Sequence, residues 1–277
     1  MADTKTLESL QKLEQLLRKY DGAVIAYSGG VDSSVVMAAA TRVLGARALA
    51  CIGVSPSYPD REKTAALAVA KSVGAVVRIV PTREENNPNY AANSANRCYY
   101  CKTELYENLA AIAREQKYAV ILDGNNASDA TEDRPGWRAA REHGVVSPLA
   151  SLGLTKPVVR MLAREMGLTV WDKPATPCLS SRVPHGVPIV PGLLKRIEAA
   201  ENVLAALGFK EFRVRHHGDV ARVELPVDDM GRAMALRQQI VLGIQQTGYI
   251  FVSLDLSGFR SGALHEATKA SQEPQHK

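Results

Sequence analysis

The first half of the chain alternates short apolar segments with longer amphipathic ones. The apolar runs have the length of strands, and in the longer segments apolar residues recur every three or four positions, as on one face of a helix. The predicted strands span 22–28, 46–55, 75–82 and 118–124, and the predicted helices span 33–45, 60–74, 103–116 and 154–167. This alternation predicts an α/β fold, a doubly wound parallel sheet whose ligands bind at the carboxyl ends of the strands.

The pattern changes near Pro188. Beyond it, the sequence predicts a helix over 191–208, two paired strands within 211–226, a long helix over 228–247 and a final strand over 249–256. A helix followed by a β-β-α-β unit is a separate packing unit. We therefore predict a larger domain over 1–187, a smaller C-terminal α+β domain over 188–266 and a disordered polar tail over 267–277.

Composition narrows the class of protein. Of the 277 residues, 46% are hydrophobic and 23% are charged, which is typical of a globular protein with a core. No apolar run approaches the roughly 18 residues that a membrane helix needs. The amphipathic segment 1–20 has no apolar signal-peptide core, so we expect a cytoplasmic location. In that reducing compartment the four cysteines are not expected to form structural disulfides.

The net charge of +5 indicates an anionic partner. The basic residues are spread along the chain and form no run. Nucleic acid is therefore disfavoured as the partner, whereas a phosphorylated small molecule is compatible with this charge.

A phosphate-binding loop is predicted directly after the first strand, where the sequence reads SGGVDSS and then enters a helix. Adjacent Gly29 and Gly30 let the backbone approach a phosphate closely. Ser28, Ser33 and the free N–H groups of the helix N-terminus can hold an anion. Asp32 would repel a bare phosphate, so we expect it to help hold Mg²⁺ bound to that phosphate.

The four cysteines divide into one core residue and three candidates for chemistry. Cys51 lies within an apolar strand and is expected to be a buried small hydrophobe. Cys98 and Cys101 form a CxxC ahead of a helix, and Cys178 lies in a distant loop. The CxxC alone is compatible with a redox pair or half of a zinc site, although no second ligand pair exists. The three together suit a [4Fe-4S] cluster with one open iron.

These motifs carry a resemblance to known enzymes. SGGVDSS resembles the PP-loop signature of the ATP-pyrophosphatase superfamily, which has the adenine nucleotide alpha hydrolase-like fold. Together with RCYYCK, PGWRAAREHGVVSPL and KPATPCLSSRVPHG, the chain resembles the LarE family, sulfur transferases that build the nickel-pincer nucleotide cofactor of lactate racemase. The resemblance implies an ATP-dependent enzyme that adenylates the carboxylates of pyridinium-3,5-biscarboxylic acid mononucleotide, releasing pyrophosphate. Sulfur then displaces AMP and leaves thiocarboxylates.

The resemblance also implies a source for the sulfur. One type of LarE protein has a single cysteine, at the position of Cys178, and gives up its own sulfur. The other type has three cysteines and a [4Fe-4S] cluster, and this chain resembles it. We therefore expect Cys98, Cys101 and Cys178 to ligate the cluster, with sulfide carried on its open iron. Sacrificial transfer from Cys178 remains the alternative.

Further nucleotide-binding residues follow from the same resemblance. Ser55 ends the second strand, where this superfamily meets the adenine. Gly124 and Asp129 follow the fourth strand in DGNNASD, with Asp129 a candidate metal or polar contact. Asp32 and Ser33 are expected to be catalytic.

The mononucleotide substrate carries a phosphate and two carboxylates, so its site should be cationic. Arg182, next to Ser181, is expected to act in catalysis and to bind this substrate. Arg213 and Arg215 alternate on one strand and share a face. They are expected to grip the phosphate, with Glu198 and Glu224 orienting the arginines; a solvated strand face explains the strand arginines equally well.

Two rival functions remain open at this point. Some PP-loop tRNA thiolases also carry three cysteines, although no RNA-binding module is recognisable here. A nucleotide-binding regulator without turnover is the other rival. The C-terminal unit resembles assembly regions of the superfamily, so we expect a homo-oligomer, specifically a hexamer.

Overall fold

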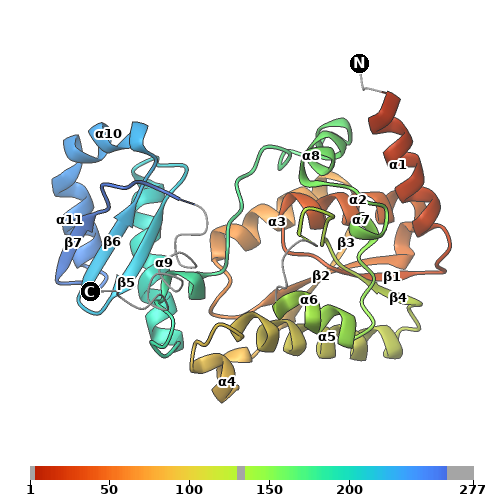
Figure 1. Ribbon diagram of the computed structural model, residues 1–277, viewed down its shortest axis with the longest axis horizontal. Coiled ribbons are helices and arrows are strands. Elements are labelled where there is room, and N and C mark those ends of the chain that lie inside the picture. Colours follow the sequence, from red (N-terminus) through yellow and green to blue (C-terminus); the bar gives the residue numbers. More distant parts are fainter. Residues whose placement is uncertain (1–3, 130–134, 261–277) are drawn as a thin grey trace, which may run out of the picture. The chain divides into compact units, whose positions relative to one another are not determined.

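The computed structural model describes residues 4–129 and 135–260, so the predicted tail 267–277 lies outside the described residues. Contacts divide the chain into two compact units (Figure 1). Unit 1 comprises Met1–Tyr90 and Asn96–Thr176, and unit 2 comprises Ala91–Ala95 and Pro177–Lys277. No helix within the described ranges is long and apolar enough to cross a membrane.

The division falls earlier than the boundary predicted near residue 187, because the segment before that residue packs within unit 2. The side chain of Asn93 donates hydrogen bonds to the carbonyl oxygens of Pro184 and Val187, at 2.7 and 2.9 Å. The backbone N–H of Ile189 bonds the carbonyl of Ala91 at 2.8 Å. These bonds draw a short stretch of the first half of the chain into unit 2.

Unit 1 is built on a four-stranded parallel sheet, as predicted. The strands are β1 (Ala23–Ala26), β2 (Ala48–Val54), β3 (Val76–Pro81) and β4 (Val120–Leu122), in the order β3-β2-β1-β4. All of β1 is buried, which explains its uninterrupted apolar sequence. The chain runs outward from β1 through β2 and β3 and returns to the other side of β1 as β4. The carboxyl end of β1 is therefore the point where such sheets bind ligands.

Helices cover both faces of this sheet (Figure 1). One face packs against α1 (Thr4–Leu17), α2 (Val31–Leu44), α3 (Asp60–Ser72), α7 (Pro148–Ser151) and α8 (Lys156–Glu165). The other packs against α5 (Arg97–Glu115) and α6 (Pro135–Glu142). Short helices η1 (Gly45–Arg47), η2 (Glu84–Asn86) and α4 (Pro88–Ala91) lie in the connections. Two apolar cores result, one on each face of the sheet.

The start of α5 differs from the sequence prediction. The helix was predicted over 103–116, but it begins at Arg97 and includes the CxxC in its first two turns. The N–H of Tyr99 already bonds the carbonyl of Asn96 at 2.9 Å. Tyr99 also packs beneath Arg138 of α6, with the guanidinium 4.2 Å from its ring centroid. This contact between helices favours the additional turn, and no local sequence pattern reveals it.

Unit 2 contains the predicted β-β-α-β arrangement, with one difference. The strands β5 (Arg213–His217) and β6 (Val220–Glu224) are antiparallel, and β7 (Phe251–Leu254) lies parallel to β6. The helix predicted over 228–247 is instead η5 (Val227–Asp229), α10 (Met230–Ala235) and α11 (Arg237–Gln245). The break lies at Leu236, whose ψ of 9° departs from the helical value. The remaining helices are α9 (Pro191–Ala206) and η4 (Leu179–Arg182).

Gly124, just after β4, lets the backbone lie very close to the start of α2. Substituting this glycine therefore tests the fold. A Cβ at Gly124 would lie 2.6 Å from the backbone nitrogen of Ser33. We expect Gly124→Ala to lower the free energy of unfolding by about 1–3 kcal/mol, because backbone atoms must shift. The measurement is urea-induced unfolding of the full chain.

Gly192 provides the matched control, since a Cβ there would meet no atom within 4 Å. Gly192→Ala should leave stability unchanged or slightly higher. Equal stability of the two variants would contradict the close approach at Gly124.

Candidate functional site

The SGGVDSS segment, predicted to bind phosphate, lies at the carboxyl end of β1 and leads into the N-terminus of α2. Gly29 has a φ of +71°, which favours glycine, and a Cβ there would lie 2.7 Å from that of Ala66. The Ser33 hydroxyl donates to the carbonyl of Gly30 and accepts from the N–H of Ser28, both at 3.2 Å. Ser33 therefore fixes the shape of the loop, while Ser28 is exposed at its surface.

Asp32 lies in the first turn of α2 and joins two further segments of unit 1. Its Oδ2 forms an ion pair with Lys156 of α8. Its Oδ1 accepts a hydrogen bond from the Asn126 side-chain amide at 3.1 Å, and the same nitrogen bonds Asp129 at 2.7 Å. The N–H of Ser128 donates to the side-chain Oδ1 of Asn126 at 2.9 Å, which fixes the orientation of this amide. Asn126 thus brings Asp32 and Asp129 together.

A second lysine lies beside the loop itself. The Lys173 ammonium is 2.7 Å from the Glu62 carboxylate of α3 and 3.4 Å from the carbonyl oxygen of Gly29. Neither Lys156 nor Lys173 was singled out by sequence. Lys173 begins the KPATPCLSSRVPHG segment that carried the family resemblance, whereas Lys156 lies outside the motifs that carried it.

The loop after β2 is organised around a buried carboxylate that sequence analysis also missed. Glu84 of η2 is 2% exposed, and its Oε1 accepts hydrogen bonds from Ser55 at 2.6 Å and Ser57 at 3.0 Å. The Cys101 thiol lies 3.9 Å from the same oxygen. Glu84 therefore links the segment expected to meet the nucleotide to the helix that carries the CxxC.

The segment after β4 is held by buried Asp123. Its carboxylate accepts hydrogen bonds from Ser147 at 2.6 Å and from the phenol of Tyr106 at 3.2 Å. Burial raises the pKa of Asp123, and the hydrogen bond from Ser147 opposes that rise. Gly124 follows directly and packs its backbone on Ser33. In this structure Gly124 thus serves close packing, and its predicted contact with the nucleotide stays a prediction.

None of the four cysteines forms a disulfide. Burial raises the pKa of the Cys51 thiol to about 12, which suits an inert core residue. Cys98 and Cys101 lie one helical turn apart in α5 of unit 1, where Cys98 is exposed and Cys101 half-buried. Cys178 immediately precedes η4 in unit 2 and is half-buried. Among the described residues, no group of three or more His, Cys, Asp or Glu side chains is arranged to hold a metal.

Arg182 forms a fully buried ion pair in unit 2. Its Nε is 2.8 Å from the Oε1 of Glu201, and the two side chains are 1% and 0% exposed. Arg182 also donates to the carbonyl of Pro177 at 2.6 Å and to the hydroxyl of Ser181 at 2.9 Å. The carboxylate that orients Arg182 is therefore Glu201 and not Glu198, because Glu201 is the one that α9 directs into the core.

The arginines of β5 are also buried, so the interpretation of a solvated strand face is wrong. Arg215 pairs with Glu224 at 2.9 Å, as the sequence suggested, and donates to the carbonyl of Ser181 at 2.6 Å. Arg213 has no carboxylate within 4 Å in the part of the chain that the structure describes. Burial, together with the positive charges of Arg215 and Arg182, lowers the pKa of Arg213 to about 10. The cluster is thus rich in positive charge.

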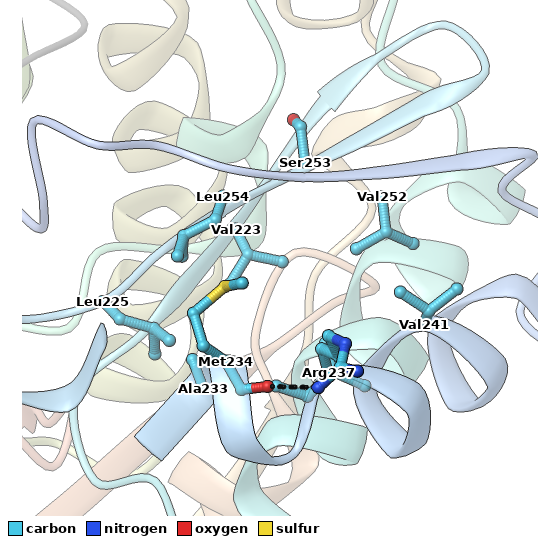
Figure 2. Close-up of a pocket in the computed structure, with 10 residues that line it drawn as sticks. Val223, Leu225, Ala233, Met234, Arg237, Val241, Val252, Ser253 and Leu254 are labelled. Atoms are coloured by element: carbon cyan, nitrogen blue, oxygen red, sulfur yellow. Dashed lines mark hydrogen bonds between the residues drawn. The ribbon is translucent and has the colours of Figure 1, made fainter. Parts of the chain in front are cut away.

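A separate pocket of about 180 Å³ lies in unit 2, between β6, β7 and the helices α10 and α11. Figure 2 shows its aliphatic lining, with Val223 and Leu254 from the strands and Met234 and Val241 from the helices. The Arg237 guanidinium donates to the Met234 carbonyl at 3.3 Å. The lining lacks convergent polar groups, so this pocket is not a candidate for the chemistry of adenylation.

The fold and the loop together define an α/β nucleotide-binding protein of the PP-loop type. Residues 7–126 match the NAD synthase family. The pyridinium-3,5-bisthiocarboxylic acid mononucleotide synthase of Lactiplantibacillus plantarum is 35% identical over 257 residues, which cover 92% of this chain and 93% of that protein. The chain therefore belongs to the LarE family of enzymes, within the PP-loop superfamily.

Two uncharacterized proteins are also similar. A protein of Synechocystis sp. is 44% identical over 265 residues, which cover 94% of this chain and 98% of that protein. A protein of Methanocaldococcus jannaschii is 29% identical over 262 residues, which cover 92% and 98% of the two chains. Similarity over nearly the whole length extends the relationship through both units.

The Arg182–Glu201 pair gives a stability prediction. Glu201→Ala leaves the Arg182 charge buried without a carboxylate, and we expect a loss of about 3–5 kcal/mol in the free energy of unfolding. Half-buried Glu198, on the same helix, provides the control, and Glu198→Ala should cost about 1 kcal/mol or less. Urea unfolding measures both variants, and a larger loss at Glu198 would reverse the assignment.

Proposed function

We propose that this enzyme adenylates the carboxylates of pyridinium-3,5-biscarboxylic acid mononucleotide with ATP and converts them to thiocarboxylates. The observation that carries the proposal is the 35% identity, over 92% of the chain, to a synthase of that bisthiocarboxylic acid product. The phosphate loop at the carboxyl end of β1 supports it, because a PP-loop site is suited to cleavage at the α-phosphate.

In the first step a substrate carboxylate oxygen attacks the α-phosphorus of ATP, and pyrophosphate leaves. The N–H groups at the start of α2 face this leaving group and stabilise its charge. Ser33 keeps the loop in shape through its bonds to Ser28 and Gly30, and Asp32 and Asp129 present carboxylate oxygens next to it. These oxygens suit Mg²⁺, which would neutralise phosphate charge when bound with ATP.

Lys156 is suited to assist this step. In the structure its charge is balanced by Asp32. When Asp32 turns to a cation, the Lys156 ammonium becomes available to a phosphate oxygen. Lys156 thus has two partners, one in the free enzyme and one in the complex.

Unit 2 is proposed to bind the phosphate of the mononucleotide. Arg213 is the strongest candidate, since it is the arginine of the cluster without a carboxylate partner among the described residues. Arg215 and Arg182 already have carboxylate partners and shape the cluster around it. The Ser181 hydroxyl donates to the Cys178 carbonyl at 2.8 Å, so it also holds the backbone next to that cysteine.

The cysteines are proposed to hold a [4Fe-4S] cluster. Cys98 and Cys101 lie one turn apart on α5, neither they nor Cys178 form a disulfide, and cysteine thiolates are the usual ligands of such clusters. Cys98, Cys101 and Cys178 would be the ligands, and the cluster would supply an open iron position for sulfide. Sulfur attack on the acyl-adenylate then releases AMP. A homo-oligomeric, hexameric assembly and a cytoplasmic location stay predictions.

The adenylation step can be tested separately. Asp32→Ala and Ser33→Ala should lower substrate-dependent release of pyrophosphate by about 100-fold or more, because each removes a group that shapes or charges the phosphate site. Asp60→Ala, on the exposed start of α3, is the control and should keep the wild-type rate. Wild-type rates in both loop variants would show that the loop is not the ATP site, and added sulfide should rescue neither variant.

The sulfur source can be tested by iron content. Anaerobic reconstitution should give about four irons per chain, and alanine at Cys98, Cys101 or Cys178 should abolish the brown chromophore. Cys51→Ala is the matched control and should retain it, because Cys51 is fully buried in β2. A protein that binds no iron and loses the mass of one hydrogen sulfide at Cys178 after turnover would establish sacrificial transfer instead.

A further inference from the structure

We infer that Lys173 is a second polyphosphate-binding residue of this enzyme, one that contacts the β- and γ-phosphates of ATP and the pyrophosphate that leaves. The inference rests on the proposed ATP site and names a residue that adds to it. Lys173 lies in unit 1, beside Gly29 of the phosphate loop. It is distinct from Lys156, which lies beside Asp32.

Hydrogen bonds hold the backbone around Lys173 in place and so fix the direction of its side chain. Arg160 of α8 donates two hydrogen bonds of 3.0 Å each, to the carbonyl oxygens of Trp171 and Lys173. The N–H of Lys173 bonds the carbonyl of Val170 at 3.1 Å. The two nitrogens of one planar guanidinium therefore hold this segment on α8 in a fixed orientation.

The Lys173 ammonium is positioned but not saturated. It has three N–H donors, of which one reaches Glu62 at 2.7 Å and a second makes only a long contact of 3.4 Å with Gly29. The Lys173 side chain is 20% exposed and that of Glu62 is 14% exposed. An incoming phosphate oxygen can therefore take the remaining donor capacity while Glu62 keeps the lysine in place.

Packing brings these groups to the phosphate side of the loop. Gly29 lies directly on Ala66 of α3, one turn after Glu62. The carboxylate, the lysine and the loop are thus held by the same helix. A phosphate bound by the loop amides brings a negative charge next to the carbonyl of Gly29, where Lys173 supplies the compensating charge.

Lys173 lies close to Cys178 in the sequence. Only Pro174–Pro177 separates it from Cys178, which lies at the start of the second segment of unit 2. Polyphosphate binding by Lys173 therefore anchors the start of the segment that carries Cys178.

Two single variants of the full-length protein, Lys173→Gln and Glu62→Gln, test the inference. Dissociation constants for ATP, inorganic pyrophosphate and AMP are measured by calorimetry with Mg²⁺ present. Lys173→Gln should weaken ATP and pyrophosphate about tenfold or more and leave AMP within about twofold, because AMP lacks the β- and γ-phosphates. Retained AMP binding also shows that the variant is folded.

Glu62→Gln separates phosphate binding from a purely structural ion pair. Both variants break the pair, but Glu62→Gln leaves the lysine charge, so ATP and pyrophosphate should bind at least as tightly as to wild type. The control is Lys63→Gln on the same helix, where Lys63 pairs with Asp60, and it should change nothing.

Three results would overturn the inference. Equal weakening of ATP binding in Lys173→Gln and Glu62→Gln would show that the pair is only structural. If Lys173→Gln binds ATP as tightly as the wild-type protein does, the role of Lys173 is refuted and the proposed function is not. A wild-type protein that binds neither ATP nor pyrophosphate would refute the proposed function as well.

Discussion

The arrangement of unit 1 around the phosphate loop depends on two places where backbone lies very close to a neighbouring helix. A Cβ at Gly124 would lie 2.6 Å from the nitrogen of Ser33, and one at Gly29 would lie 2.7 Å from the Cβ of Ala66. These two approaches hold the phosphate loop between β4 and α3. The helix N-terminus is thereby fixed at the carboxyl end of β1 before any ligand arrives, which reduces the cost of ordering on binding.

The charges around this loop are balanced within the free enzyme. Asp32 pairs with Lys156, and Glu62 pairs with Lys173. Such pairs let a site keep strongly charged groups without leaving any of them buried and unpaired. A ligand that brings both phosphate and a cation can exchange partners with each pair. These two pairs are the charged groups that the proposed ATP and its cation would meet.

In unit 2 the buried arginines outnumber the carboxylates that pair with them among the described residues. Arg182, Arg213 and Arg215 are buried, and among the described residues Glu201 pairs with Arg182 and Glu224 with Arg215. One positive charge is left over in a desolvated setting, and the lowered pKa of Arg213 reports its cost. Positive charge retained at such a cost favours an anionic ligand. In physical terms, the charges beside the unit 1 loop are paired with one another, whereas the buried arginines of unit 2 outnumber the carboxylates paired with them among the described residues.

The sequence by itself determined the parallel sheet, the phosphate loop and the family, because strand–helix alternation and the SGGVDSS turn are local patterns. It also suggested that Glu224 orients the clustered arginines, and the structure pairs Glu224 with Arg215. Only the tertiary structure decided that Glu201 pairs with Arg182, that α5 begins at the CxxC, and that Lys156 and Lys173 reach the loop. Those contacts join residues far apart in the chain, and no spacing rule encodes which lysine or carboxylate packing will bring to a given loop.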